Sequence, residues 1–152
     1  MKIGVISDTH GLLRPEALRA LAGVEAILHA GDVGDRAILE ALGSIAPVTA
    51  IRGNIDRTGP CSALPATEWV KLGGAVFYLI HDEKELDLNP GAAGISVVVS
   101  GHSHQAKVER SKGVLYLNPG SAGPRRFRLP VTLARVTLDN GRVEAEIVEL
   151  EP

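Results

Sequence analysis

Seven side chains of the kinds that bind metal ions follow apolar runs of the chain, each close to the point where a run ends. They are Asp8, His10, Asp32, Asn54, His81, His102 and His104. Glycines stand beside several of them, and a glycine lets the backbone turn sharply and approach a neighbour closely because it has no Cβ. In α/β proteins, ligands collect in the loops at one edge of the sheet. The positions therefore predict that these side chains share one site.

The chemistry of this set favours a transition-metal site. Carboxylate, imidazole and amide oxygen together suit Mn, Fe, Zn and similar cations, whereas Ca and Mg favour oxygen ligands alone. Seven donors are too many for one four-coordinate ion but suit two ions that share a carboxylate. Two cations about 3.5–4 Å apart can activate a hydroxide and neutralise the oxygens of an in-line displacement at phosphorus. The set therefore indicates hydrolysis of a phosphate ester.

The elements that must position these residues alternate between strand and helix at first and then become mostly strand. Pro15 and Asp35 are typical of the starts of two helices. The predicted strands are 2–6, 26–29, 48–51 and 96–100, and the predicted hairpins join 67–71 to 75–80, 107–110 to 114–117 and 131–138 to 142–150. Two stacked sheets with helices outside would bury both sets of apolar faces. We therefore expect a single α/β domain over residues 1–152.

The composition argues against several classes of protein. The chain has 152 residues, of which 45% are apolar and 22% charged, and its formal net charge is −2. Without clustered Lys and Arg, we expect no extended nucleic-acid surface. Cys61 is the single cysteine, which excludes an intramolecular disulfide and a thiolate zinc cage. No apolar window approaches 18 residues and no leader is recognisable, so we expect a cytoplasmic protein that does not span a membrane.

Five motifs in one order carry a resemblance to a known family. They are SDTHG at 7–11, HAGD at 29–32, RGN at 52–54, the lone His81, and GHSH at 101–104. In these motifs, over nearly its whole length, the chain resembles the calcineurin-like metallophosphoesterase superfamily. Its size and its NPGS segment at 118–121 are most similar to the small prokaryotic phosphodiesterases of the YfcE type. The resemblance implies a four-layer αββα sandwich of two mixed β-sheets flanked by helices.

The resemblance also implies the arrangement of two divalent ions and their chemistry. A first ion would be held by Asp8, His10 and His104, and Asp32 would bridge it to a second ion completed by Asn54, His81 and His102. Manganese is the expected metal, with Ni, Zn, Fe or Co as alternatives. The implied nucleophile is a metal-bridging hydroxide. Asp32 would set the spacing of the ions, and we expect His102 to stabilise charge that develops on the leaving group.

Substrate contacts are predicted at three positions. Asn54 would contact the substrate beside its role as a ligand, and an arginine fork at Arg125 or Arg126 would suit a phosphate group. The alternative for the arginines is a solvated basic patch. The expected substrate is a small phosphodiester.

The chain departs from the family pattern at two positions. Ile55 follows Asn54, where many members of the superfamily have a histidine, and the YfcE-type enzymes also lack that histidine. This departure favours diesters over monoesters. Asp82 stands after His81, where glycine is usual, so the acidic stretch 82–85 could face the site and change the choice of substrate.

Other polar residues have plainer interpretations. His29 is predicted to be a satisfied structural residue that supports Asp32. Asp56 and Arg52 flank Asn54 and form either a surface ion pair or part of the site. Ser121 does not stand in a Gly-x-Ser-x-Gly nucleophile elbow, because Pro119 occupies the first glycine position.

Two other functions stay open at this point. The same site could hydrolyse phosphomonoesters or nucleic acid. The fold could instead serve as a non-catalytic scaffold for protein interaction, as in the retromer subunit that resembles this superfamily. The sequence also leaves the oligomeric state open, a homodimer or higher homo-oligomer included.

Overall fold

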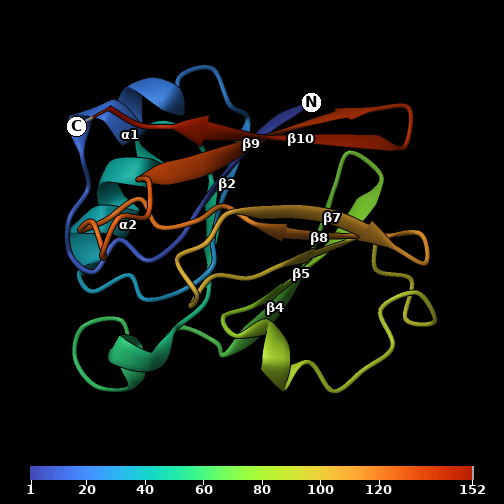
Figure 1. Ribbon diagram of the computed structural model, residues 1–152, viewed down its shortest axis with the longest axis horizontal. Coiled ribbons are helices and arrows are strands. Elements are labelled where there is room, and N and C mark those ends of the chain that lie inside the picture. The colour runs from blue at the N-terminus through green and yellow to red at the C-terminus, as the bar shows by residue number, and fades with distance from the viewer. Residues whose placement is uncertain (152) are drawn as a thin grey trace.

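Within residues 1–151, which the computed structural model describes, ten strands form two five-stranded sheets (Figure 1). The first sheet has the order β10-β9-β1-β2-β3, and the second has the order β4-β5-β6-β8-β7. The strands of the first sheet are β1 (Lys2–Ile6), β2 (Ala26–His29), β3 (Val48–Ala50), β9 (Thr132–Asp139) and β10 (Arg142–Glu149). Those of the second are β4 (Thr67–Leu72), β5 (Ala75–Ile80), β6 (Val97–Val99), β7 (Lys107–Ser111) and β8 (Val114–Asn118).

Both sheets are mixed, and each contains three adjacent parallel strands. β1, β2 and β3 are parallel, and β9 and β10 add to them as an antiparallel hairpin. In the second sheet β5, β6 and β8 are parallel, and β4 and β7 pair antiparallel to their neighbours. The carboxyl ends of the parallel strands in each sheet therefore point to one edge, where their loops gather.

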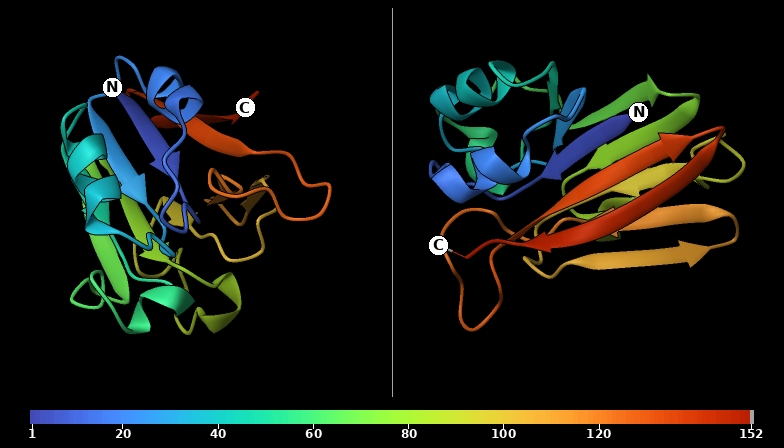
Figure 2. Two further views of the ribbon diagram at one scale, coloured as in Figure 1. Left: turned by 90° about the vertical axis from the view of Figure 1, so that its left-hand side faces the viewer. Right: turned by 90° about the horizontal axis from the view of Figure 1, so that it is seen from above.

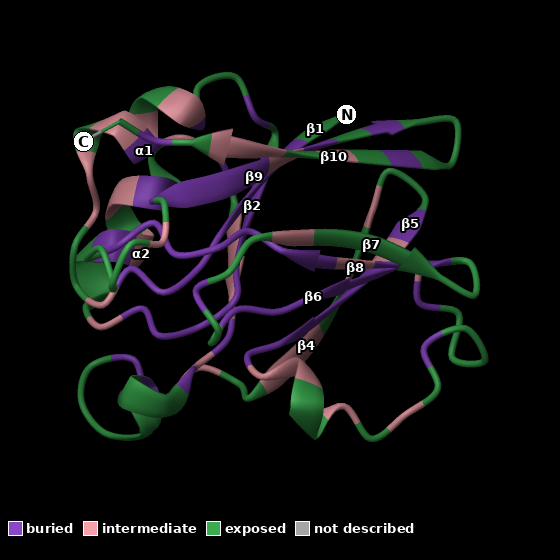
Figure 3. Cartoon of the chain, viewed as in Figure 1, coloured by how far each residue is buried: buried purple, intermediate pink, exposed green. Residues whose placement is uncertain are grey.

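The core lies in three layers of apolar side chains. The largest layer fills the space between the sheets, with Val5 and Leu28 on one side and Phe77 and Val99 on the other. The strands are buried there, as Figure 3 shows for β6 and β9. A second layer lies between the first sheet and the helices α1 (Pro15–Ala20) and α2 (Arg36–Gly43). Figure 2 shows the same two helices beside β1 and β2 from other directions.

The outer face of the second sheet is covered by a different kind of layer. Tyr78 and Val98 of the sheet pack with Leu86, Leu88 and Ile95. These covering residues belong to the segment 86–95, which follows the one-turn 3₁₀ helix η2 (Glu83–Glu85). Pro90, Gly91 and Gly94 in this segment oppose an α-helix. The predicted four-layer sandwich is confirmed, and its fourth layer consists of a short turn and a loop.

The predicted strands and helices are confirmed, with small shifts at their ends. The strand predicted at 96–100 is shorter, Val97–Val99. Another 3₁₀ helix, η1 (Asn54–Arg57), follows the third strand, where the sequence predicted no element. The N-cap of α2 is Asp35, whose side chain accepts a hydrogen bond from the amide of Ala37. No helix in residues 1–151 is long and apolar enough to cross a membrane.

Candidate metal centre

Five of the seven predicted ligands have a left-handed backbone, which is rare for residues other than glycine. Their φ values are 56° for Asp8, 47° for His10, 54° for Asp32, 70° for His102 and 62° for His104. Such a conformation costs on the order of 1–3 kcal/mol per residue, so the surrounding structure must enforce it. Backbone hydrogen bonds between the loops do this, from the amide of Asp8 to the carbonyl of Gly31 and from the amide of His10 to that of Asp32.

Asp8 lies at the centre of the cluster and is fully buried. Its Oδ2 accepts hydrogen bonds from the hydroxyl of Ser7 (2.7 Å) and from the backbone amide of His102 (3.2 Å). Its Oδ1 faces three imidazoles, at distances from Nε2 of 3.4 Å for His104, 3.7 Å for His10 and 3.8 Å for His81. One oxygen of the carboxylate is thus held by the protein, and the other is directed into the cluster.

As in Asp8, one carboxylate oxygen of Asp32 is held by a backbone amide and the other faces imidazoles. Oδ1 accepts a hydrogen bond from the amide of Ile55 at 3.0 Å. Oδ2 lies 3.2 Å from His81 Nε2 and 3.5 Å from His10 Nε2. This carboxylate therefore stands between two imidazoles that come from different sheets, which is the placement expected of a group that joins two ions.

Hydrogen bonding assigns the tautomer of His81. Its Nδ1 lies 2.7 Å from the carbonyl oxygen of Ala30. A carbonyl can only accept, so Nδ1 carries the proton and the imidazole, when neutral, has a free lone pair on Nε2. Metal-binding histidines are commonly oriented in this way by a carbonyl behind the ring.

Four buried polar atoms of the cluster have no hydrogen-bond partner among the described residues. They are Asp8 Oδ1, His10 Nε2, His81 Nε2 and His104 Nδ1. Buried polar atoms are nearly always paired, because leaving one unpaired costs about 1–3 kcal/mol. Atoms of this kind in one place fit divalent cations, since a cation satisfies carboxylate and imidazole lone pairs together.

The geometry divides the cluster into two groups of ligand atoms, each with its atoms within 4.8 Å of one another. The first group is Asp8, His10 and His104, the set that the sequence assigned to the first ion. The second group is Asp8, Asp32 and His81. Asp8 is therefore the member that the two groups share, whereas Asp32, which the sequence assigned as the bridging ligand, belongs to the second group alone. The bridging role of Asp32 stays a prediction.

Asn54 and His102 lie outside both groups. Asn54 is exposed at the start of η1. The side chain of His102 is 45% exposed, and its Nε2 lies 3.8 Å from Asp82 Oδ2. Its ring is nevertheless beside that of His81, with 5.4 Å between the ring centroids. Both residues therefore lie on the open side of the cluster, and their roles as ligands stay predictions.

The cluster shifts the ionisation of its own members. Burial opposes ionisation of Asp8, but the neighbouring imidazoles of His10, His104 and His81 outweigh it and hold its pKa well below the usual range. Burial also opposes ionisation of Asp32, and His81 together with the Ile55 amide lowers its pKa. For His81, burial favours the neutral ring, but Asp32 and Asp8 raise the pKa to about 8. Without cations, a protonated His81 balances part of the carboxylate charge.

His29 is a satisfied structural residue, as predicted, although its hydrogen bonds go to Gly31 and Thr9 and not to Asp32 itself. It is fully buried, its Nδ1 accepts from the amide of Gly31 (3.2 Å), and its Nε2 lies 3.0 Å from the hydroxyl of Thr9. That hydroxyl donates to the carbonyl of Val33, so it accepts from Nε2–H and the ring is neutral. Burial lowers the pKa of His29 to about 4, which agrees with a neutral ring that ties the first two loops together.

The interpretation of Asp56 as half of a surface ion pair is wrong. Asp56 is 1% exposed and accepts three backbone hydrogen bonds, from Val33 (3.0 Å), Gly34 (3.0 Å) and Gly53 (2.9 Å). Arg52 instead donates to the carbonyl of Leu64. Asp56 therefore ties the loop of Asp32 to the loop of Asn54. A signal was present in the sequence, since an acidic residue three positions after a glycine is suited to bond back to it.

The segment 118–121 supports the cluster from behind. The Asn118 amide nitrogen donates to the carbonyl of Gly101 (2.9 Å) and to the hydroxyl of Ser103 (3.1 Å). Ser121 is buried, and its hydroxyl donates to the carbonyl of Asp8 (3.1 Å). These bonds agree with the conclusion that Ser121 is no nucleophile. The sequence missed these supporting roles because they depend on contacts with residues far away in the chain.

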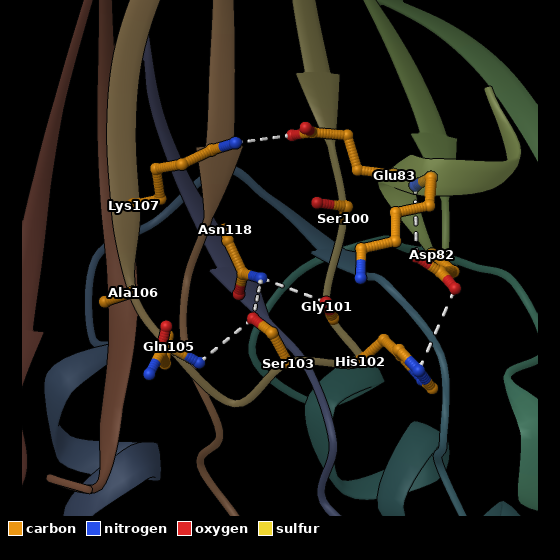
Figure 4. Close-up of a pocket in the computed structure, with 11 residues that line it drawn as sticks. Asp82, Glu83, Ser100, Gly101, His102, Ser103, Gln105, Ala106, Lys107 and Asn118 are labelled. Carbon is orange, nitrogen blue, oxygen red and sulfur yellow. Dashed lines mark hydrogen bonds and ion pairs between the residues drawn. The ribbon is translucent and has the colours of Figure 1, made fainter.

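Two cavities, of about 350 Å³ and 370 Å³, lie on either side of the open edge of the cluster. The first is lined by His102, Ser103, Gln105, Lys107 and Asn118, and the second by Arg52, Asn54, Arg57, Thr67 and His81. Asp82 lines both. Figure 4 shows the first cavity, with the side chains of Asp82 and His102 directed toward each other. The sequence left the role of Asp82 open.

Arg125 and Arg126 are exposed and belong to the lining of neither cavity. Among the described residues, neither guanidinium forms a hydrogen bond or ion pair with the cluster. Their part in substrate binding stays a prediction.

Known proteins resemble this chain in sequence and in fold. A probable metallophosphoesterase of Methanothermobacter thermautotrophicus is 37% identical, over 97% of this chain and 92% of the relative. A structure of an archaeal phosphodiesterase superposes with a TM-score of 0.79 at 22% identity, covering 97% of this chain and all of that one. The structure of the Escherichia coli phosphoesterase YfcE superposes with a TM-score of 0.69 at 22% identity, covering 99% of this chain and all of that one.

A third similar structure is named for protein sorting and not for a phosphoesterase activity. It is vacuolar protein sorting 29 of Cryptosporidium parvum, with a TM-score of 0.76 at 20% identity, covering 99% of this chain and 98% of that one. At this level of identity the three structures establish the fold alone. The family model of the calcineurin-like phosphoesterase superfamily domain matches residues 1–141. The chain therefore belongs to the calcineurin-like phosphoesterase superfamily.

Proposed function

We propose that this chain is a metal-dependent phosphodiesterase with a dinuclear centre. Asp8, His10, Asp32, His81 and His104 would hold the two cations, and Asn54 and His102 would complete the set from the open side. Manganese is the proposed metal, and Ni, Zn, Fe or Co suit the same donors. The observation that carries the proposal is the gathering of buried carboxylates and imidazoles whose ligand atoms lie within 4.8 Å of one another in each group, together with the cluster's buried polar atoms that have no hydrogen-bond partner among the described residues.

When bound, such a pair of cations would supply an activated water and neutralise the oxygens of the phosphoryl group. The residues of the chain prepare the place where this happens. Ser7 and the amide of His102 fix Asp8, the amide of Ile55 fixes Asp32, and the carbonyl of Ala30 fixes His81. None of these groups has to reorganise during the reaction, which is the condition for effective electrostatic stabilisation.

His102 is the proposed group on the leaving side. Its ring is half exposed, stands beside His81, and lines the first cavity. An imidazole there would donate a hydrogen bond to the leaving oxygen as negative charge develops on it. Arg125 and Arg126 remain proposed contacts of the substrate, reached from the exposed loop after residue 121.

Two features support diesters over monoesters. Ile55 stands where many members of the superfamily have a histidine. A cavity on each side of the open edge also provides space for both substituents of a diester. The structural similarity to an archaeal phosphodiesterase agrees with this preference.

The proposal is tested by Asp32→Ala. Because this carboxylate stands between His10 and His81, its loss should abolish both metal uptake and hydrolysis of an aryl phosphodiester. Metal content, turnover and circular dichroism are measured together, after stripping with a chelator and reloading with Mn. The matched control is Asp35→Ala, an exposed helix cap whose loss should leave metal content and turnover unchanged. Full activity of Asp32→Ala would sink the proposal.

A second candidate is a protein-interaction scaffold with the same fold, which the similarity to vacuolar protein sorting 29 favours. Metal analysis separates the two. A phosphodiesterase purified without chelator should contain close to two equivalents of transition metal per chain, whereas a scaffold should contain little. Rates of hydrolysis measured on an aryl phosphodiester, its monoester and nucleic acid decide between phosphodiesterase activity and the other hydrolytic activities.

A further inference from the structure

Asp82 lies at the open edge of the cluster, between the two cavities. It follows His81 directly at the end of β5 and lines both cavities. Its Oδ1 accepts a hydrogen bond from the amide of Lys84 and thereby caps η2, and this bond holds the carboxylate in place. Its Oδ2 lies 3.8 Å from Nε2 of His102. A negative charge is therefore held beside His102, the residue proposed for the leaving side.

None of the other charged groups among the described residues of the first cavity is paired with the carboxylate of Asp82. Lys107 is paired with Glu83 at 2.7 Å, so these two offset each other. Lys84 is exposed and is the remaining cation in the lining. The four charged groups sum to zero, so any selectivity must come from the position of Asp82 rather than from net charge. Asp82 alone among them forms an ion-pair contact with a residue of the cluster.

A phosphate group at the cluster would come close to this carboxylate. An oxygen within hydrogen-bond reach of His102 Nε2, about 3 Å away, lies no further than about 7 Å from Asp82 Oδ2. A diester carries one negative charge. A monoester carries nearly two above its second pKa of about 6. One additional charge at about 7 Å changes an equilibrium about threefold at the dielectric constant of water, about 80, and about fiftyfold at the effective value of about 20 near a protein surface, so the expected effect is on the order of tenfold.

We infer that Asp82 is a specificity-determining residue, whose negative charge beside His102 disfavours phosphomonoester dianions and so selects monoanionic diesters. This inference rests on the proposed function. The plainer alternative is that Asp82 only caps η2 and orients His102. Asparagine keeps the Oδ1 acceptor and the size of the side chain but removes the charge, so Asp82→Asn separates the two explanations.

The experiment compares kcat/KM of the Mn-loaded wild type and Asp82→Asn at pH 8 on bis(4-nitrophenyl) phosphate and 4-nitrophenyl phosphate. The ratio of monoester to diester activity should rise about tenfold in the variant. A purely orienting role would change both activities by the same factor and leave the ratio as it is. That result would overturn the inference.

Glu83→Gln is the matched control, because it removes one negative charge from the same cavity at a group already offset by Lys107. Its ratio should change by less than about threefold, since solvent screens a pair that is only partly buried. An equal rise in both variants would show an effect of net charge and refute the role assigned to Asp82.

A binding measurement gives a readout that does not depend on turnover. By calorimetry, Asp82→Asn should strengthen the binding of inorganic phosphate, mostly a dianion at pH 8, about tenfold more than it strengthens the binding of the diethyl phosphate monoanion, because each negative charge of the ligand contributes about one factor of ten. If the wild type hydrolyses neither ester, the proposed function is wrong, and the phosphate affinities alone judge Asp82. If it hydrolyses the diester and the ratio does not move, only the inference about Asp82 fails.

Discussion

Gly101→Ala, which adds a single methyl group, should disturb the metal centre although Gly101 is not itself a ligand. The backbone of Gly101 is not left-handed, so alanine meets no conformational penalty there. A Cβ, however, would lie 2.1 Å from the hydroxyl oxygen of Ser7 and 2.5 Å from Oδ2 of Asp8. Ordinary contacts need about 3.5 Å, so the loop would have to move by more than about 1 Å.

The size of the effect follows from what that movement breaks. Overpacking in a tight interior costs about 1–3 kcal/mol. Asp8 Oδ2 also loses one or both of its hydrogen bonds, from Ser7 and from the amide of His102, at about 1 kcal/mol each. We expect Gly101→Ala to lower the free energy of unfolding of the metal-free protein by about 2–5 kcal/mol. Metal affinity should fall by about 10- to 100-fold, as when groups that orient a ligand are lost.

Urea unfolding of the metal-free protein measures the first effect, and competition with a chelator measures the second. Gly43→Ala is the control, because Gly43 is a helical residue of α2 whose Cβ would meet nothing within 4 Å. That variant should be more stable by about 0.5–1 kcal/mol and bind metal as the wild type does. Wild-type stability together with unchanged metal affinity in Gly101→Ala would refute the packing argument.

Two further predictions concern the stability of the metal-free protein. The pKa of His81 rises from 6.5 in the unfolded chain to about 8 in the cluster, so its contribution is complete below pH 6.5 and disappears as the pH rises through 8. Urea unfolding should show a loss of about 2 kcal/mol over that interval, from 1.5 pKa units at 1.36 kcal/mol each, and His81→Gln should lack it. Asp56→Ala leaves three backbone amides without their acceptor and should cost about 3 kcal/mol or more, against about 1 kcal/mol for the exposed cap in Asp35→Ala. Equal losses in these two variants would contradict the role assigned to Asp56.

Much of the fold was predictable because its signals are local. The hairpins turn at Gly73-Gly74 and Asn140-Gly141, where the glycines have positive φ as the turns require. The strands were marked by runs of β-branched residues such as Val97–Val99. The types of the ligands were equally visible, since carboxylate, imidazole and amide side chains are identified by sequence alone. The layer that covers the outer face of the second sheet was not predictable, because it is a loop whose apolar residues show no helical repeat.

The sequence by itself determined which chemistry is available and that it stands at the ends of strands. Only the tertiary structure decided which side chains meet. His102 donates its amide to Asp8 across 94 positions of the chain, and Ser121 donates to the same residue across 113. The packing of one sheet on the other sets these distances, and it also buries Asp56 and turns Asp82 toward His102. Periodicity and turn residues encode the direction of a strand, whereas the separation of two side chains on different sheets depends on the whole core between them.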